Sequence, residues 1–598
     1  MLRRHLLKGV AALPFATALT DPLARATAAS ALARRIRPSD PAWPSEESWA
    51  VLRQAVGGRL VRPRTVWATC AAEPATPQCL ASLKIVHNPL ALGDDPGGTQ
   101  VSGWLDAWTP TASAYAVAVR SSGDVVEAVN FARRNNLRLV VKGGGHSYLG
   151  GSNAPESLLI WTRAMNRIEL HDAFVPAGCA VPPAPAVTLD AGCMWIDAYT
   201  QVTTRAGRYV QGGGCTSVGV AGLIQGGGFG SFSKRYGLAA ASLLQAEIVT
   251  ADGRLRTVNA SQDADLFWAL QGGGGGSFGV VTRLTLKTHA LPEHFGFVGA
   301  KIKASTPQAY RRLVARFVAH YAEALCNPHW GEAFNLYKDE VEVSMVCQGL
   351  DAGQAKAIWA PFFDELRASP QDFTFIEDAY FGVSRAQAWW DLKSNPAMIL
   401  DSRRDAAPGH GWWRGDQEQV SMFLHGYDSQ WLPASLLQPR ERPRLVDALV
   451  AASQSMIVRL HFNKGLAGAS AEIRAAARRC PTNPAVADAF CLAIVATGGP
   501  PPFPSLPGPK PDMAEAHRNA RNVAAASTEL KRVAPEGGSY ISETDFFRAD
   551  WRQAFWGKNY RRLKAIKDHC DPDGFFFVHH GVGSEDWSAD GFTRAHSA

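Results

Sequence analysis

The sequence predicts an α+β protein with more than one domain. A chain of 598 residues can build more than one hydrophobic core. Between residues 115 and 282, strand-like and helix-like segments alternate around glycine-rich turns. From about Gly296 the glycine runs stop, and β-branched strands with amphipathic helices indicate a second, α+β domain that contains a sheet.

Composition narrows the class of protein. Hydrophobic residues make up 46% and charged residues 19%, which is typical of a globular chain. The net charge of +7 is spread over the chain without a basic run in the mature part, so no nucleic-acid partner is expected. Ten cysteines are too few for a disulfide scaffold. Cys70 and Cys79 could pair in an oxidising compartment, whereas Cys193 and Cys491 read as core thiols.

The N-terminal residues have the pattern of an export signal. Arg3-Arg4, a weakly apolar stretch from Gly9 to Leu19 and small residues at 24–28 resemble a twin-arginine signal over residues 1–28. The alternative is an N-terminal membrane anchor, but the apolar stretch is too short to span a bilayer comfortably. We therefore expect a periplasmic or extracellular protein with no membrane insertion after signal removal. Residues 29–107 are rich in Pro and Ala and read as a lead-in that packs on the next domain.

A glycine turn before His146 is the first feature that suggests chemistry. YAVAVR from Tyr115 reads as a strand, SSGD as a helix cap and LRLVVK from Leu137 as the next strand. Gly143, Gly144 and Gly145 follow. Glycines let backbone approach a ligand closely, and their free N–H groups suit an anion such as a pyrophosphate. The alternative is a flexible turn with a solvent-facing histidine.

The next segments again alternate strands and helices around glycine-rich turns. We expect a strand at AVTLDAG, a helix from Trp195 to Arg205, a strand at RYVQGG, and a hairpin across LLQAEIVTADGRLRTV. Between them, Gly212 to Leu238 is glycine-rich, which suits backbone against a large flat group. Asp265 to Leu270 reads as a short helix. Gly274, Gly276 and Gly279 satisfy G-x-G-x-x-G, but residues 280–288 alternate as a strand does, so the dinucleotide fingerprint and the P-loop are both rejected.

The remaining segments complete the expected elements. Thr306 to Leu325 reads as a helix with Thr306 as the cap, and Pro443 to Ser455 as another. VEVSMVCQGL and SMIVRLHF read as sheet strands. GGPPPFPSLPGPKP, residues 498–511, reads as an exposed loop. Trp551 to His569 reads as one helix ended by DPDG.

These motifs together resemble the berberine-bridge-enzyme-like branch of the vanillyl-alcohol-oxidase flavoproteins. The resemblance is carried by GGGHSYLG, GGGCTSVGVAGLIQGGGFGSFSKRYGL, EIVTADG, DLFWALQGGGGGSFGVVT and FWGKNYRRLKAIKDHCDPDGFF. It implies a two-part PCMH-type FAD-binding domain made of residues 108–291 and a C-terminal segment, 540–598. Residues 292–539 would form a central α+β substrate domain with an antiparallel sheet.

The resemblance also implies how FAD is held. His146 occupies the position that bonds the flavin 8α carbon, and Cys215 the position that bonds C6, so we expect bicovalent FAD; the alternative for Cys215 is a small core residue. A histidine nitrogen and a cysteine thiolate are the nucleophiles that such attachments need. The other expected cofactor-binding residues are Gly143, Gly144, Gly145, Ser147, Val218, Gly219, Gly222, Gly228, Gly279, Val280 and Asn559.

Oxidation of an alcohol or amine needs a base for the substrate proton. We expect Tyr540 to be the substrate-facing acid/base and Glu543 to be the second candidate; the alternative is a buried structural tyrosine. The related pattern Tyr-x-Asn has Ser542 at its third position here, a departure that weakens transfer of mechanism. Val218 is smaller than the leucine that accompanies poor oxygen reactivity in the family, which favours an oxidase.

Three other clusters each allow a functional and a structural interpretation. His579-His580 lacks the spacing of a metal site, so no metal is expected. His461, Asn463 and Lys464 either face the substrate or end a strand. Trp389-Trp390 and Trp412-Trp413 either line an aromatic or sugar-binding cleft or belong to a core.

The sequence therefore predicts an exported FAD-dependent oxidase that takes hydride from an alcohol, amine or sugar and reduces O2 to H2O2. One alternative is a flavin dehydrogenase that uses another acceptor. The other is a non-catalytic exported binding protein with the same fold, against which the intact His146 and Cys215 argue.

Overall fold

The computed structural model describes residues 34–595, apart from residue 75 and residues 504–508. The signal segment expected at residues 1–28 lies outside this range. Within the described part of the chain, no helix has both the length and the apolar character needed to cross a membrane.

The first sheet has four strands and carries the glycine turn at one end. Its order is β1 (Leu60–Val61), β2 (Tyr115–Ala118), β4 (Leu158–Trp161) and β3 (Leu139–Lys142). Helix α6 (Ser122–Arg134) connects β2 to β3 and begins where the Ser121 hydroxyl accepts from Asp124 N, as the sequence predicts. Strand β4 lies between β2 and β3 and runs parallel to both, so the strand–helix–strand unit spans a gap of one strand.

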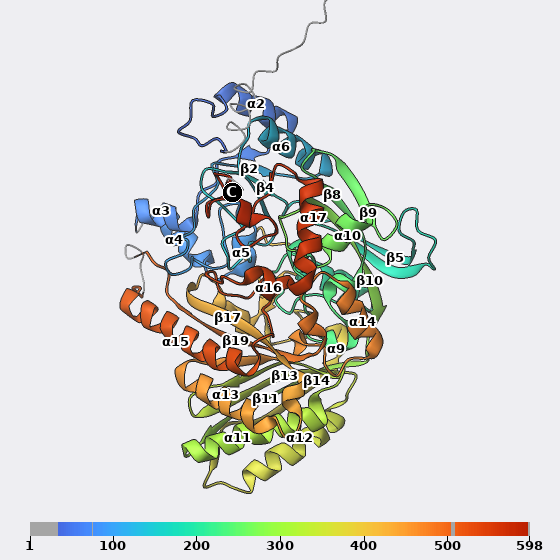
Figure 1. Ribbon diagram of the computed structural model, residues 1–598, viewed down its shortest axis with the longest axis vertical. Helices are drawn as coiled ribbons and strands as arrows, with labels where there is room; N and C mark the ends of the chain where they lie inside the picture. The colour runs from blue at the N-terminus through green and yellow to red at the C-terminus, as the bar shows by residue number, and fades with distance from the viewer. Residues whose placement is uncertain (1–33, 75, 504–508, 596–598) are drawn as a thin grey trace, which may run out of the picture.

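The N-terminal lead-in belongs to this first layer. Strand β1 pairs antiparallel with β2, and helix α2 (Glu46–Ala55) packs on α6. The ring of Trp49 stacks on Tyr115 with their centroids 3.9 Å apart. Figure 1 shows α2 at one end of the molecule, over α6 and β2. The lead-in therefore extends the first sheet as well as packing on it.

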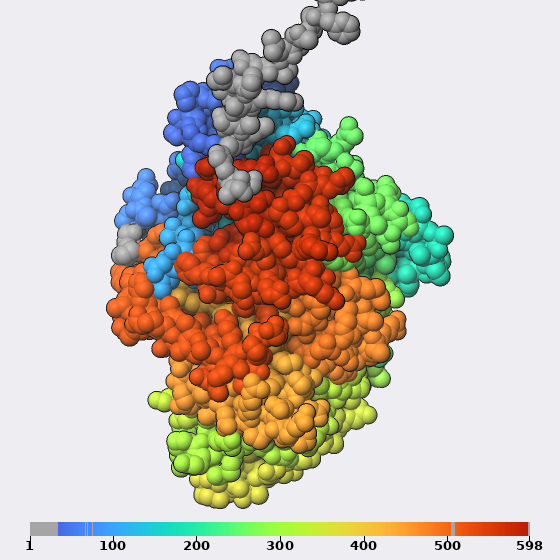
Figure 2. All heavy atoms as spheres, in the orientation of Figure 1, coloured from blue at the N-terminus to red at the C-terminus, as the bar shows by residue number. Residues whose placement is uncertain are grey.

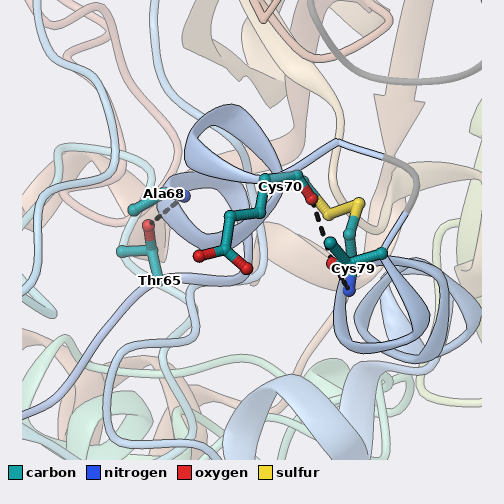
Figure 3. Close-up of a disulfide and its surroundings, with 6 residues drawn as sticks. Thr65, Ala68, Cys70 and Cys79 are labelled. Carbon is teal, nitrogen blue, oxygen red and sulfur yellow. Dashed lines mark hydrogen bonds between the residues drawn. A yellow bond between two sulfur atoms is a disulfide. The ribbon is translucent and has the colours of Figure 1, made fainter.

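A short helical hairpin projects from the lead-in and contains a disulfide. Helices α3 (Val66–Ala72) and α4 (Pro77–Ile85) are joined by the Cys70–Cys79 bond (Figure 3). The ring of Trp67 stacks against Phe503 of the proline-rich loop, with centroids 5.7 Å apart. The disulfide is the pairing that the sequence left open, and the contact of Trp67 with Phe503 joins the hairpin to the proline-rich loop.

The second sheet has six strands, and the longest of them, β10 (Val280–Ala290), is its centre. They are β5 (Ile168–Phe174), β6 (Ala184–Asp190), β7 (Arg208–Val210), β8 (Leu243–Val249), β9 (Leu255–Asn259) and β10 (Val280–Ala290). Strand β10 pairs antiparallel with β6, β7 and β8. The strand predicted after Gly279 is confirmed, and with it the rejection of the dinucleotide fingerprint. Five short helices decorate this region: α5 (Pro89–Gly93), α7 (Trp195–Tyr199), α8 (Val220–Gln225), α9 (Ser233–Tyr236) and α10 (Ala264–Leu270).

The central domain is built on a seven-stranded antiparallel sheet. Its order is β14 (Phe373–Arg385), β11 (His294–Ala304), β13 (Glu340–Gln348), β12 (Trp330–Leu336), β18 (Val458–His461), β19 (Ala489–Gly499) and β17 (Phe423–Pro433). Residues of four helices share one core with this sheet: α11 (Pro307–His320), α12 (Ala352–Arg367), α13 (Arg442–Ser455) and α15 (Met513–Val533). Figure 1 shows α11, α12 and α13 against the sheet at the end opposite α2. Helix α14 (Ala471–Arg479) and the ribbon β15 (Met398–Leu400) with β16 (Gly411–Trp413) complete the domain.

Alternation along these strands separates a core face from a polar face. On β13, Val341, Val343 and Met345 are buried against the helices. Glu342 and Ser344, between them, line the cavity described below. Successive strand residues point to opposite faces, so the sheet serves both as the wall of a core and as the roof of a site.

The C-terminal segment returns to the first two sheets. Phe576 forms a bridge with Leu139 of β3, and the Arg35 guanidinium donates to the Gly574 carbonyl at 2.7 Å. Figure 2 shows the C-terminal residues, in red, spread over the upper half of the visible face. Both ends of the described chain therefore contact the layer formed by the first two sheets.

One helix boundary differs from the prediction. Residues 551–569 form two helices, α16 (Trp551–Trp556) and α17 (Tyr560–Cys570), so the single predicted helix is wrong. Gly557 has φ +52°, a left-handed conformation that ends a helix and that glycine adopts without strain. The break turns the chain so that α17 packs on α10.

A buried ion pair anchors α17 to the glycine-rich segment. The Lys567 ammonium donates to the carbonyls of Ser277 at 2.6 Å and Phe576 at 2.8 Å, and it pairs with Asp571. Asp571 in turn accepts from the Phe575 and Phe576 amides. Both charged side chains are almost fully buried, so each depends on the other.

We expect Asp571→Asn to lower the free energy of unfolding by about 3 kcal/mol, because it leaves a buried ammonium without its counter-charge. Denaturant-induced unfolding measures the change. The matched control is Asp568→Asn, which removes the exposed partner of Lys564 on the same helix and should cost less than about 1 kcal/mol. Equal losses in the two variants would contradict the assignment of α17 as a buried anchor.

Candidate functional site

A cavity of about 1470 Å³ lies between the glycine-rich layer and the polar face of the seven-stranded sheet. Three glycine clusters line it: 143–145, 212–214 and 274–276. Residues of β12, β13, β18 and β19 and of the C-terminal segment line it as well. Ligand pockets commonly have about 300–1,000 Å³, so this cavity has room for a large cofactor together with a substrate.

Two glycine turns meet at its base. A Cβ at Gly144 would lie 2.7 Å from the Ser217 carbonyl oxygen and 2.8 Å from Gly219 N, which no other residue could accept without moving the backbone. The close approach brings the His146 ring to the Ser217 hydroxyl, at 3.0 Å from Nε2. His146 and Cys215, two residues before Ser217, both line the cavity.

The surroundings of His146 favour a neutral imidazole. Burial lowers its pKa to about 4, and the Ser217 contact opposes this only in part. At neutral pH the ring therefore carries one free lone pair. In the tautomer in which Nε2–H donates to the Ser217 hydroxyl, the lone pair lies on Nδ1, which is then the nitrogen available for a further bond.

Cys215 has a carboxyl partner that the sequence analysis did not single out. Its thiol donates to Asp416 Oδ1 at 3.4 Å. Burial and the Asp416 charge raise the pKa of the thiol well above its usual value, while burial raises the pKa of Asp416 to about 6. Asp416 lies in the 3₁₀ turn Arg414–Gln419, far away in sequence, and RGDQEQ carries no periodic signal that could have revealed it.

Tyr540 and Glu543 both reach the cavity but in different states. The Tyr540 ring packs edge-on against Phe229, and burial together with the Glu543 charge raises the pKa of its hydroxyl. Hydrogen bonds from Ser542 and the Gly228 backbone act in the opposite direction. Both carboxylate oxygens of Glu543 accept from Lys464 Nζ, at 2.5 and 2.6 Å. Tyr540 is thus neutral, and both carboxylate oxygens of Glu543 are paired with Lys464.

Glu332 of β12 is a second carboxyl that sequence reasoning missed. It has φ +62°, which is rare for a residue other than glycine and marks local strain. The Ser231 hydroxyl donates to it, Asn463 lies 3.5 Å away, and burial raises its pKa. Its place in WGEAFNL, a charged residue amid apolar ones, was the only available signal.

Of the polar and aromatic residues that the sequence analysis singled out, some line the cavity and one is buried in a core. His461, Asn463 and Lys464 all line the cavity, as do Trp389, Trp390 and Trp413. Trp412 is buried in the core of the second sheet. Arg459 of β18 also lines the cavity. Burial lowers the pKa of His461, and the charges of Lys464 and Arg459 lower it further.

The remaining expected cofactor residues are not all at the cavity. Those that line it are Gly143, Gly144, Gly145, Ser147, Val218, Gly219, Gly222 and Gly279. The Gly228 backbone hydrogen-bonds the Tyr540 hydroxyl, and Val280 is buried where β10 pairs with Val249. Asn559 donates its amide to the carbonyls of Cys480, Pro481 and Thr482. Asn559 therefore holds a neighbouring loop and does not line the cavity.

The histidine pair at 579–580 is packed against aromatic rings. His579 stacks on Phe546 with centroids 3.9 Å apart, and His580 stacks on Trp551. Across residues 34–595, with the gaps named above, no group of three or more His, Cys, Asp and Glu side chains is placed to hold a metal ion.

These features fit FAD. The glycine clusters present backbone to the cavity where a flat ring system and a pyrophosphate would need close approach. A neutral histidine, His146, and a cysteine, Cys215, line the same cavity. No side chain blocks the junction of the two turns, since Gly144 and Gly219 form it.

Comparison with known families supports this assignment. Residues 113–259 match the family described as "FAD binding domain", and residues 539–583 match "Berberine and berberine like". The FAD-linked oxidoreductase malF of Malbranchea aurantiaca is 30% identical over 94% of both chains. The FAD-linked oxidoreductase easE of Trichophyton verrucosum is 31% identical over 93% of this chain and 91% of its own.

Solved structures agree. A VAO-type flavoprotein of Myceliophthora thermophila C1 superposes with a TM-score of 0.76 at 25% identity, over 94% of this chain and 100% of its own. The glucooligosaccharide oxidase of Acremonium strictum shares the fold, with a TM-score of 0.61 at 19% identity over 83% and 99% of the two chains. With relatives at 30% identity and above along nearly its whole length, the chain belongs to the berberine-bridge-enzyme-like FAD-linked oxidoreductases of the vanillyl-alcohol-oxidase superfamily.

Proposed function

We propose that the protein is an exported oxidase that holds FAD through two covalent bonds, from His146 to the flavin 8α carbon and from Cys215 to C6. The observation that carries the proposal is the meeting of the two glycine turns. It puts both nucleophiles on one cavity and links them through the contact of His146 with Ser217. In the Acremonium oxidase the cofactor is a 6-S-cysteinyl, 8α-N1-histidyl FAD, which supports the same pairing here.

The side chains of the cavity then supply the acid/base group. The bound flavin supplies the hydride acceptor. Tyr540 faces the substrate and serves as acid/base for its hydroxyl or amine proton, because both Glu543 oxygens are occupied by Lys464. Glu543 remains the second candidate. Hydrogen bonds from Ser542 and the Gly228 backbone stabilise the ionised form of Tyr540 and so ease loss of its proton, against burial and the Glu543 charge, which raise the pKa of the hydroxyl.

The polar roof suits a small substrate with hydroxyl or amine groups. Asn335, Glu342 and Ser344 project from the sheet into the cavity, and Trp389 and Trp413 supply flat apolar surfaces. An alcohol, an amine or a sugar would satisfy both kinds of surface. We propose O2 as the electron acceptor, since Val218 at the cavity leaves more room than a leucine would.

Export is supported by two features of the N-terminal part. Arg3-Arg4 and the apolar stretch after it resemble a twin-arginine signal. The disulfide between Cys70 and Cys79 belongs to an oxidising compartment. Both are consistent with a periplasmic or extracellular enzyme.

Acid precipitation tests the attachment. We expect the yellow colour of the purified wild-type protein to stay in the pellet, and to move to the supernatant in the variant His146→Ala/Cys215→Ala. Each single variant should keep the colour in the pellet, because one bond remains. Absorbance of the two fractions measures the outcome.

Cys193→Ala is the matched control, because Cys193 is a free, buried cysteine of the same layer outside the cavity. Its flavin should stay in the pellet. Flavin retained by the double variant would show that the attachment sites are wrong. A colourless wild-type protein, after loading with FAD has failed, would favour a non-catalytic binding protein.

We expect Tyr540→Phe to lower the rate of flavin reduction by about 10²-fold to 10⁴-fold, the usual contribution of a positioned acid/base. The substrate is first found by screening alcohols, amines and sugars with peroxide detection, and stopped-flow bleaching then gives the rate. Tyr337→Phe is the control: this hydroxyl also lines the cavity, but it donates to Glu342 at 2.8 Å. Comparable rates in wild type and Tyr540→Phe would move the role to Glu543.

We expect Val218→Leu to slow reoxidation of the reduced protein by O2, because the larger side chain fills space at the cavity where O2 would approach. The protein is reduced by substrate without oxygen and then mixed with oxygenated buffer. Val218→Ala, which adds no bulk, should not slow reoxidation. If the wild type itself fails to react with O2 but reduces a quinone or dye, the protein is a dehydrogenase.

A further inference from the structure

The turn that carries Asp416 is fixed against the turn that carries Cys215. The Thr216 hydroxyl donates to the Gly411 carbonyl at 2.8 Å, and the Trp413 indole donates to the Gly214 carbonyl at 3.2 Å. These bonds flank Cys215 on both sides. They hold the Asp416 carboxyl 3.4 Å from the thiol although the two residues are 201 positions apart.

Asp416 has one oxygen committed and one free. Oδ1 accepts from the Cys215 thiol, whereas Oδ2 is buried and has no hydrogen-bond partner among the described residues. An unpartnered carboxyl oxygen at this depth is costly unless it has a use. Because Asp416 lines the cavity, Oδ2 can pass a proton to water or ligand there.

Attack on a flavin carbon requires a thiolate, but the surroundings of Cys215 keep its thiol protonated. Three charged groups act on the sulfur: Asp416 from the 3₁₀ turn, Glu332 from β12 and Lys464 after β18. Only Asp416 makes a hydrogen bond with the thiol. Burial brings the pKa of Asp416 to about 6, so at neutral pH it is mostly ionised and can accept a proton.

We propose that Asp416 is the base that takes the Cys215 thiol proton when the protein attaches its own flavin at C6. The inference rests on the proposed bicovalent linkage. The S–H bond breaks, its proton passes to Asp416 and then to water, and the sulfur forms a bond to C6. The flavin takes up the electron pair as the C6 hydrogen leaves as a proton. O2 then removes two electrons and two protons as H2O2, which leaves an oxidised flavin thioether.

The test isolates this bond by removing the other one. In a His146→Ala background the C6 thioether is the only link expected, and acid precipitation with mass analysis of the flavin peptide measures it. Apo-protein produced under riboflavin limitation is loaded with FAD, and the linked fraction is followed over time. We expect Asp416→Asn to slow linkage by about 10²-fold or more, while total bound flavin before denaturation stays equal.

Two variants serve as controls. Glu418→Gln removes an exposed carboxylate of the same turn, and Glu332→Gln removes the other buried carboxyl near the sulfur. Glu418→Gln should link FAD at the rate of the His146→Ala parent, and Glu332→Gln should not slow linkage, because the Glu332 charge raises the pKa of the thiol. Asp416→Glu, which restores a carboxylate, should recover part of the rate.

The pH dependence of the linkage rate distinguishes a role of Asp416 as a base from a purely structural role. Linkage in the Asp416→Asn variant should accelerate as pH rises toward the thiol pKa, because hydroxide then replaces the missing base, whereas the parent should be fast already at neutral pH. Normal linkage in Asp416→Asn, or slow linkage without recovery at high pH, would overturn the role of Asp416. If His146→Ala alone carries no linked flavin, the bicovalent linkage itself fails, and this inference fails with it.

Discussion

The contact between two backbone turns, at Gly144 and at residues 217–219, sets the arrangement of the whole site. A side chain on either glycine would push the turns apart, since the atoms that a Cβ would meet are backbone atoms that cannot rotate away. One turn follows β3 of the first sheet and the other follows β7 of the second, so the contact also fixes the two sheets relative to each other. The reactive side chains His146 and Cys215 follow from this geometry, because each lies within four residues of the contact.

The sequence predicts this region well because glycine has few structural reasons to cluster. Strand and helix periodicity located β2, α6, β3, β8, β9 and β10 within a few residues. The predicted helix at 551–569 failed at Gly557, where one glycine in a favourable helical pattern adopts a left-handed conformation. A single glycine inside such a pattern does not by itself predict a break, since helices tolerate it at a cost of about 1 kcal/mol.

The carboxyl groups of the site could not be predicted for a different reason. Glu332 and Asp416 act on the cavity only because the seven-stranded sheet and the 411–416 segment fold over the glycine turns, and these are contacts between residues more than 100 positions apart. Nothing in the local pattern of either segment encodes such a partner. Asn559 shows the converse: its motif predicted a role at the cofactor, whereas its amide is used up by three carbonyls of a loop.

Three carboxyl groups that line the cavity, Glu332, Asp416 and Glu543, differ in their hydrogen-bond partners. Lys464 pairs with Glu543, and Glu332 accepts a hydrogen bond from Ser231. Among the residues that the structure describes, the Cys215 thiol is the only hydrogen-bond partner of the Asp416 side chain. A carboxyl whose sole donor is a weak one is poorly stabilised as an ion, and this explains why burial dominates its pKa. The same poor stabilisation makes it a stronger base than a surface aspartate. The cost of burying Asp416 without a strong donor and the capacity of Asp416 to take a proton from Cys215 thus have one physical origin.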